Sequence, residues 1–368
     1  MPVYPLAQFK NLEKTKRILL RFDFSYYQLY ESKFLEFIEA LMAADKQVVV
    51  LVSGPEENVR AAIKVCKSKY ADDYCQFACD EQPKFIDTVK MILTEPVARL
   101  CFLTGFDDYG PEKFLQVSFA HDLAKLGDLY VIDSLHLHGQ LTSSVSLLPL
   151  LLPTYYGPNT AADWQALDDL RKSLFSKRSA LVLGGQVDFT KMEALETILP
   201  KLDYLLMGTS WTSYFWNKKT RQMAHRETEN FAKILKKFAA KVIYPLDFMA
   251  ARYDAKTGRY DLRLAKAAEI ENKDLLVDLG PETIRHYALL MKESDNIIYD
   301  NLLSPNTNEP GHADMILARA MANRARGKAF GIGLGRPLLD LLLKENLNEF
   351  MDMMVAEASA AYKFLINK

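Results

Sequence analysis

Long hydrophobic runs, a secretory signal and an excess of charge of either sign are all missing from this sequence of 368 residues. The longest apolar run, residues 147–152, is interrupted by a proline, whereas a helix that crosses a bilayer needs about 20 apolar residues. The segment 1–17 lacks the apolar centre that a signal peptide contains. We therefore expect a cytoplasmic protein that does not interact with membranes.

Charge and cysteine content exclude two further classes of site. The formal net charge is −1, so the basic excess of a typical nucleic-acid-binding protein is missing and we expect no nucleic-acid partner. The four cysteines, Cys66, Cys75, Cys79 and Cys101, all lie in the first third of the chain. Because no histidine lies near Cys75 and Cys79 in the sequence, a zinc set is incomplete. We predict reduced thiols and no metal site.

What the sequence does contain is a regular alternation of short apolar runs and amphipathic segments. Hydrophobic residues make up 49% and charged residues 25%, as is typical of globular proteins. Apolar runs bounded by turn residues predict buried strands, and the segments between them predict helices. The predicted strands are residues 17–24, 48–52, 74–78, 98–103, 180–183, 204–207, 241–244 and 296–299.

This alternation predicts an α/β protein made of two Rossmann-like domains, each a mostly parallel sheet flanked by helices. The length of 368 residues is sufficient for two such domains. We place the N-terminal domain at residues 1–159, a joining helix at 160–177 and the C-terminal domain at 178–368. Residues 248–262 predict a loop or a hairpin, with its turn at Thr257 and Gly258.

Glycines end several of the predicted strands in the second half. Gly184 and Gly185 follow the strand 180–183, and Gly208 follows the strand 204–207, with a helical pattern between them. Ligands of open parallel sheets bind at the carboxyl ends of the strands, so these glycines mark a predicted binding site. Gly333 and Gly335 precede another predicted helix, where backbone N–H groups can hold an anion. Turn geometry or packing is the alternative explanation for this second glycine-rich turn.

Several segments resemble phosphoglycerate kinase. Residues 119–133, FAHDLAKLGDLYVID, are similar to the family's F-A-x-x-L-A-x-L-G-D-x-Y-V-N-D segment. Residues 17–24 resemble R-V-D-F-N, with Arg21 and Asp23 in matching positions, and residues 184–191 resemble G-G-A-K-V-x-D-K. The resemblance implies the phosphoglycerate kinase fold, with a phosphoglycerate site in the N-terminal domain, a nucleotide site in the C-terminal domain and a hinge helix between them.

The same resemblance indicates that the phosphoglycerate site has lost its basic residues. The histidine and arginine of the family's S-H-L-G-R-P segment correspond to Gly54 and Glu57. Two further arginines correspond to Gly105 and Gln140. Each charged hydrogen bond contributes roughly 1.5–3 kcal/mol. Losing four implies affinity weaker by on the order of 10⁴-fold, so we expect weak or no binding of 3-phosphoglycerate.

The nucleotide site departs from the family pattern as well. Val187 replaces the first signature lysine, and Arg336 replaces the aspartate of G-G-G-D, which would disturb metal chemistry linked to the nucleotide. Glu357 replaces a glycine of the S-T-G-G-G-A-S segment, whose helix start stabilises the transferred phosphoryl group in the family. Because phosphoryl transfer depends on positive electrostatics, a carboxylate there opposes it.

Few candidate site residues remain. The vestigial catalytic candidates are Asp23, Lys191 and Arg336. Lys191 is equally compatible with an exposed helix lysine and with a phosphate contact. The candidates for nucleotide binding are Gly184, Gly185, Lys191, Gly208, Asp300, Gly333 and Gly335.

Our leading hypothesis is a catalytically degenerate relative of phosphoglycerate kinase. It would need no cofactor and would bind a protein partner or serve as a subunit of a larger assembly. The first alternative is a divergent active kinase that transfers phosphate between ATP and 3-phosphoglycerate by means of Asp23, Lys191 and Arg336. The second alternative is a sensor that binds an anion, or ATP or ADP with Mg²⁺, without turnover.

Overall fold

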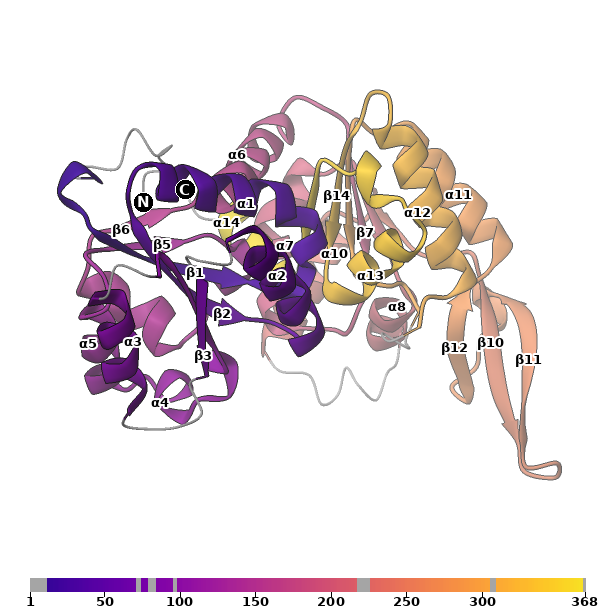
Figure 1. The fold of residues 1–368 in the computed structure, drawn as a ribbon. Helices are drawn as coiled ribbons and strands as arrows, with labels where there is room; N and C mark the ends of the chain where they lie inside the picture. The colour runs from indigo at the N-terminus through magenta and orange to yellow at the C-terminus, as the bar shows by residue number, and fades with distance from the viewer. Residues whose placement is uncertain are drawn as a thin grey trace. The chain divides into compact units, whose positions relative to one another are not determined.

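The computed structural model describes residues 12–70, 74–78, 84–94, 98–216, 226–304 and 309–366. The chain divides into two compact units, Met1–Gln165 and Ala166–Lys368, which we call the N-terminal unit and the C-terminal unit. The division falls inside helix α6 (Pro158–Ser173), which overlaps the segment predicted to join two domains. Each unit contains a parallel sheet of its own (Figure 1).

The described part of the N-terminal unit contains a six-stranded sheet with the order β3-β4-β2-β1-β5-β6 and parallel pairing throughout. Its strands are β1 (Arg17–Asp23), β2 (Gln47–Ser53), β3 (Tyr74–Ala78), β4 (Leu100–Thr104), β5 (Leu129–Ile132) and β6 (Thr154–Tyr156). Its helices include α1 (Tyr27–Ala43), α2 (Glu56–Lys69), α3 (Lys84–Thr94), α4 (Gly110–Lys113) and α5 (Val117–Ala124).

Alternate residues of the central strands belong to two separate hydrophobic cores, one on each face of this sheet. Ile18 and Leu20 pack with residues of α1 and α2, whereas Leu19 packs with residues of α3 and α5. Strands buried on both faces read as continuous apolar runs, and this is why the sequence pattern located them. Cys66 belongs to the first core as a buried free thiol. The side chain of Cys75, and Cys79 altogether, lie outside the described residues.

The C-terminal unit repeats this architecture in its described residues, with a six-stranded parallel sheet in the order β15-β14-β13-β7-β8-β9. Its strands are β7 (Ser179–Leu183), β8 (Tyr204–Met207), β9 (Val242–Ile243), β13 (Asn296–Asp300), β14 (Phe330–Leu334) and β15 (Met353–Val355). Its helices include α7 (Phe189–Ile198), α8 (Thr209–Trp216), α10 (Arg226–Lys237), α11 (Pro281–Lys292), α12 (His312–Ala325), α13 (Arg336–Lys344) and α14 (Ala358–Ile366). The predicted fold class of mostly parallel sheets flanked by helices is confirmed.

A smaller antiparallel sheet is added to the C-terminal unit. It consists of β10 (Asp247–Asp254), β11 (Arg259–Lys266) and β12 (Asp274–Leu279), in the order β11-β10-β12. The hairpin predicted from residues 248–262 is present, and Gly258 adopts the positive φ of +67° that its turn requires. Figure 1 shows this hairpin reaching beyond the parallel sheet of its unit. No helix in the described ranges is both long and apolar enough to cross a bilayer.

Candidate functional site

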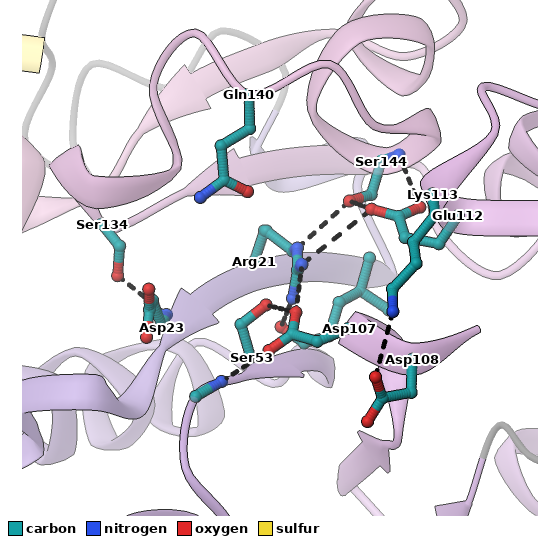
Figure 2. A network of polar contacts seen from close by, with 12 residues as sticks. Arg21, Asp23, Ser53, Asp107, Asp108, Glu112, Lys113, Ser134, Gln140 and Ser144 are labelled. Carbon is teal, nitrogen blue, oxygen red and sulfur yellow. Dashed lines mark hydrogen bonds and ion pairs between the residues drawn. The ribbon is translucent and has the colours of Figure 1, made fainter. Parts of the chain in front are cut away.

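The carboxyl end of β1 lies in the middle of the N-terminal sheet and places Arg21 where a ligand of this fold would bind (Figure 2). The Arg21 side chain is 1% exposed, and its guanidinium donates to Ser144 Oγ and to the carbonyl oxygen of Leu51, both at 3.1 Å. Its Nη2 atom also lies 3.5 Å from Asp107 Oδ1 and 3.9 Å from Glu112 Oε1. Two carboxylates of this chain therefore neutralise the arginine.

Those two carboxylates are themselves held by hydrogen bonds. Glu112 is buried and accepts from the backbone N–H of Ser144 at 2.9 Å and from its hydroxyl at 2.5 Å. Asp107 accepts from Ser53 Oγ at 2.5 Å and from the N–H of Gly54 at 2.8 Å. Figure 2 shows these groups surrounding Arg21 from both sides. The result is a closed network in which donors and acceptors satisfy one another.

Asp23, a catalytic candidate, acts as a helix cap in this network. Its Oδ1 atom accepts from the N–H of Ser25 at 2.8 Å, and its backbone N–H donates to Ser134 Oγ at 2.8 Å. The cap also explains Gly54, which was predicted to replace a histidine of the family. Gly54 has a φ of +114°, and a Cβ there would lie 2.7 Å from the backbone nitrogen of Ser25. A side chain at residue 54 is therefore excluded by the local backbone.

A cavity of about 530 Å³ opens beside this network. Its walls include three carboxylates, from Glu56, Asp107 and Asp108, and they contain no lysine or arginine among the described lining residues. Lys113 pairs with Asp108, one of these carboxylates, at 3.0 Å (Figure 2). Gln140, predicted to replace an arginine of the family, donates to the carbonyl oxygen of His136 at 3.1 Å. A phosphate-bearing acid would meet acidic walls here.

Asp133, at the end of the motif 119–133, caps helix α6. Its buried carboxylate accepts from the backbone and side-chain nitrogens of Asn159 at 2.8 and 2.7 Å and from the N–H of Thr160 at 3.0 Å. Burial raises the pKa of Asp133 from 3.8 to about 6, although the hydrogen bonds from Thr160 and Asn159 act in the opposite direction.

This shifted pKa predicts a pH dependence of folding stability. Because the folded protein holds the Asp133 proton more tightly than the unfolded chain, stability should fall as pH rises from about 4 to about 6, by about 3 kcal/mol. Chemical denaturation at several pH values measures this dependence. The variant Asp133→Asn should lose this component, and identical pH profiles for both proteins would contradict the assignment.

In the C-terminal unit, Lys191 forms a buried ion pair. Its Nζ atom lies 2.9 Å from Asp300 Oδ1 and 2.8 Å from Oδ2, and its side chain is only 10% exposed. The interpretation of Lys191 as an exposed helix lysine is therefore wrong. Residues 191 and 300 meet because α7 follows β7, and β13 pairs directly with β7 in the sheet.

At the carboxyl end of β13, the carboxylate of Asp300 also accepts hydrogen bonds from two further side chains. The hydroxyl of Tyr362 donates to Oδ2 at 2.8 Å, and Asn301 Nδ2 donates to Oδ1 at 2.7 Å. Tyr362 is fully buried, and burial followed by the charge of Asp300 raises its pKa well above the ordinary value. The ammonium group of Lys191, for which a phosphate contact was one of the two interpretations, is thus neutralised by a carboxylate of the chain itself.

Packing explains the glycines that were candidates for nucleotide binding. A Cβ on Gly184 would lie 2.3 Å from the carbonyl oxygen of Leu302, and one on Gly208 would lie 2.7 Å from that of Leu183.

Gly185 and Gly335 have φ values of +73° and +93°, and a Cβ on either would meet the side chain of Asn301. A Cβ on Gly333 would lie 2.8 Å from Leu342 Cδ1. Turn geometry and packing, the alternative explanation given for Gly333 and Gly335, are sufficient to explain the other three glycines as well.

Arg336 begins α13 and forms an ion pair with Glu357, with its Nε atom 3.0 Å from Oε1. In the sequence these two positions were interpreted separately, whereas the structure shows that they form one ion pair. The signal that could have indicated the pair is the presence of opposite charges at two positions predicted to belong to the nucleotide site. Because the guanidinium of Arg336 is a cation, it cannot serve as a ligand of Mg²⁺. Elsewhere in the described ranges no three His, Cys, Asp or Glu side chains are grouped to hold a metal ion.

Two compact units, each with a six-stranded parallel sheet flanked by helices, define the class of α/β proteins with two Rossmann-like units. Residues 84–332 of this chain match the family model of phosphoglycerate kinase, which is more than half of the chain. The chain belongs to the phosphoglycerate kinase family.

Individual relatives agree with this assignment. The phosphoglycerate kinase of Orientia tsutsugamushi strain Boryong is 23% identical over 272 residues, which cover 70% of this chain and 66% of the relative. That of strain Ikeda is 25% identical over 229 residues, covering 58% and 55%. The matches thus span between about half and two thirds of these relatives.

Solved structures share the fold over a greater length. Phosphoglycerate kinase from Coxiella burnetii gives a TM-score of 0.72 at 18% identity, covering 100% of this chain and 97% of that one. Phosphoglycerate kinase from Pyrococcus horikoshii OT3 gives a TM-score of 0.73 at 15% identity, covering 95% and 93%. At these identities the likeness establishes the fold alone.

Proposed function

We propose that this chain is a phosphoglycerate kinase relative that does not catalyse phosphoryl transfer and acts as a binding or structural protein. The observation that carries the proposal is the ion pair of Lys191 with Asp300, capped by Tyr362. A nucleotide phosphate could bind Lys191 at this sheet edge only if the ammonium group of Lys191 left the buried carboxylate of Asp300. Breaking such a pair typically costs about 3–5 kcal/mol, which opposes binding.

The surroundings of Arg21 support the same proposal. Transfer of a phosphoryl group to a phosphorylated acid requires cationic groups that are directed at the ligand. In this chain the buried guanidinium is directed at Asp107 and Glu112, and the adjoining cavity is acidic. The weak or absent binding of 3-phosphoglycerate expected from the sequence is therefore part of the proposal.

A coupled assay of the purified chain with ATP, Mg²⁺ and 3-phosphoglycerate tests the proposal. We expect no turnover above that of the variant Lys191→Met, and no shift of the melting temperature by 3-phosphoglycerate. Turnover that the Lys191→Met variant abolishes would refute the proposal and support the divergent kinase. Stabilisation by ATP or ADP without turnover would support the sensor instead.

A further inference from the structure

The outward side of the antiparallel sheet β10–β12 is a continuous apolar surface, which we call the outer face. Cross-strand register places Tyr260 beside Tyr253, Leu262 beside Ala251 and Leu264 beside Met249, and it places Leu275 on the far side of Ala251. The large side chains of the outer face are between 39% and 64% exposed; they are Tyr253, Tyr260, Leu262, Leu264, Leu275 and Val277.

The other side of this sheet already packs on the C-terminal unit. Phe248, Ala250 and Ala265 are buried there, and the ring of Phe248 contacts that of Trp216 with centroids 5.7 Å apart. Antiparallel sheets usually bury one face and present polar residues on the other. Here the face that does not pack on the unit carries large apolar side chains, so the outer face differs from an ordinary solvated surface.

Two arginines hold the sheet in shape. Arg252 on β10 and Arg263 on β11 bind the two oxygens of Asp274 on β12, at 2.8 and 2.7 Å. These pairs lower the pKa of Asp274 to about 2, with the hydrogen bond from Arg252 as the main cause. These two ion pairs connect all three strands on the side opposite the outer face. They hold in place the strands that carry the apolar side chains.

The size of the outer face can be compared with that of known interfaces. From ordinary side-chain areas, the exposed part of its large residues amounts to roughly 600 Å², at the upper end of the patches found on monomeric proteins. Two such surfaces packed together would bury roughly 1,200 Å², which reaches the lower limit of stable, specific interfaces.

We propose that a second copy of this chain covers the outer face, so that two three-stranded sheets pack face to face about a twofold axis. Sheets pack about 10 Å apart when both present apolar surfaces of similar width. A twofold axis places the face against an identical one, so the two surfaces match in size and in apolar character. The two tyrosines would lie toward one end, where their hydroxyls stay hydrated.

This inference does not depend on the loss of catalysis. It assigns the hairpin as the self-association element of the chain, and the binding partner expected from the sequence is then, in the first place, the chain itself. Leu262 is central to the surface because it lies on the middle of β11 and is the most exposed of the outer-face residues, at 64%.

Light scattering during size-exclusion chromatography of the full chain, over a range of concentrations, tests the proposal. The wild type should be a dimer, and Leu262→Glu should raise the dissociation constant about 100-fold or more, because the substitution enters the interface twice. Leu275→Glu, on a different strand, should act in the same direction. Leu289→Glu on α11 is the matched control, because Leu289 is 56% exposed and lies outside the outer face.

Circular dichroism should show native folding for all three variants, since each replaces an exposed side chain. A wild type that remains monomeric at every concentration would overturn the proposal. A dimer that survives both Leu262→Glu and Leu275→Glu would overturn it as well, because its interface would then lie elsewhere. A dimer lost in both variants and kept in Leu289→Glu would establish the outer face as the interface.

Discussion

Replacing Asp300 with alanine should lower the free energy of unfolding by about 3–5 kcal/mol. The substitution leaves the ammonium group of Lys191 buried without a counterion and removes the acceptor of the Tyr362 hydroxyl. Both groups then remain buried without the polar partner that offsets their loss of hydration. Urea denaturation followed by circular dichroism measures the change.

The exposed pair of Arg336 with Glu357 supplies the control for this experiment. Its side chains are 43% and 44% exposed, so Glu357→Ala should cost less than about 1 kcal/mol. The double variant Lys191→Met with Asp300→Ala should recover part of the loss seen in Asp300→Ala, because no buried charge remains. If Asp300→Ala and Glu357→Ala lost the same free energy of unfolding, the buried pair would stabilise the fold no more than the exposed pair does.

The substitution Gly184→Ala should destabilise the C-terminal unit by about 3 kcal/mol, because it overpacks a contact between two backbones. The new Cβ would lie 2.3 Å from the carbonyl oxygen of Leu302 and 2.6 Å from that of Asn301. Neither atom belongs to a flexible side chain, so β7 and the segment after β13 must separate. Thermal and chemical unfolding of the variant would show the loss.

Gly327→Ala is the matched control for this glycine. A Cβ on Gly327 has no heavy atom within 4 Å, and its φ is not positive. Alanine there should be neutral or slightly stabilising, because it restricts the unfolded chain. If both alanine variants lost the same stability, the close approach of Leu302 to Gly184 would not be the reason for the glycine.

The fold could be predicted because buried parallel strands leave a strong local signal. The runs 48–52 and 180–183 are apolar without interruption, and they became β2 and β7. The packing of the antiparallel sheet was harder to anticipate, since the alternation of Tyr260, Leu262 and Leu264 with other residues on β11 predicts that their face is buried, whereas the structure leaves it exposed. Which face packs on the core depends on residues such as Trp216, far away in the sequence.

The candidate sites were predicted only as positions, because their chemistry depends on partners that are distant in sequence. Lys191 and Asp300 were both recognised as site residues, but their ion pair joins positions that are 109 residues apart. Arg21 matched a family motif but was not predicted as a site residue, and its partner Ser144 is 123 residues away. A sequence shows which family ligands are missing, whereas only a structure shows which groups of the chain have taken up the remaining charges.

The pair formed by Arg336 and Glu357 couples two positions that are 21 residues apart in the sequence. An aspartate at residue 336 alone would place two carboxylates where one ion pair now lies, and a glycine at residue 357 alone would remove the carboxylate that contacts the Arg336 Nε atom. Because the pair is exposed, each of these substitutions should cost less than about 1 kcal/mol. Evolution can therefore change either position in a single step, without a compensating change at the other.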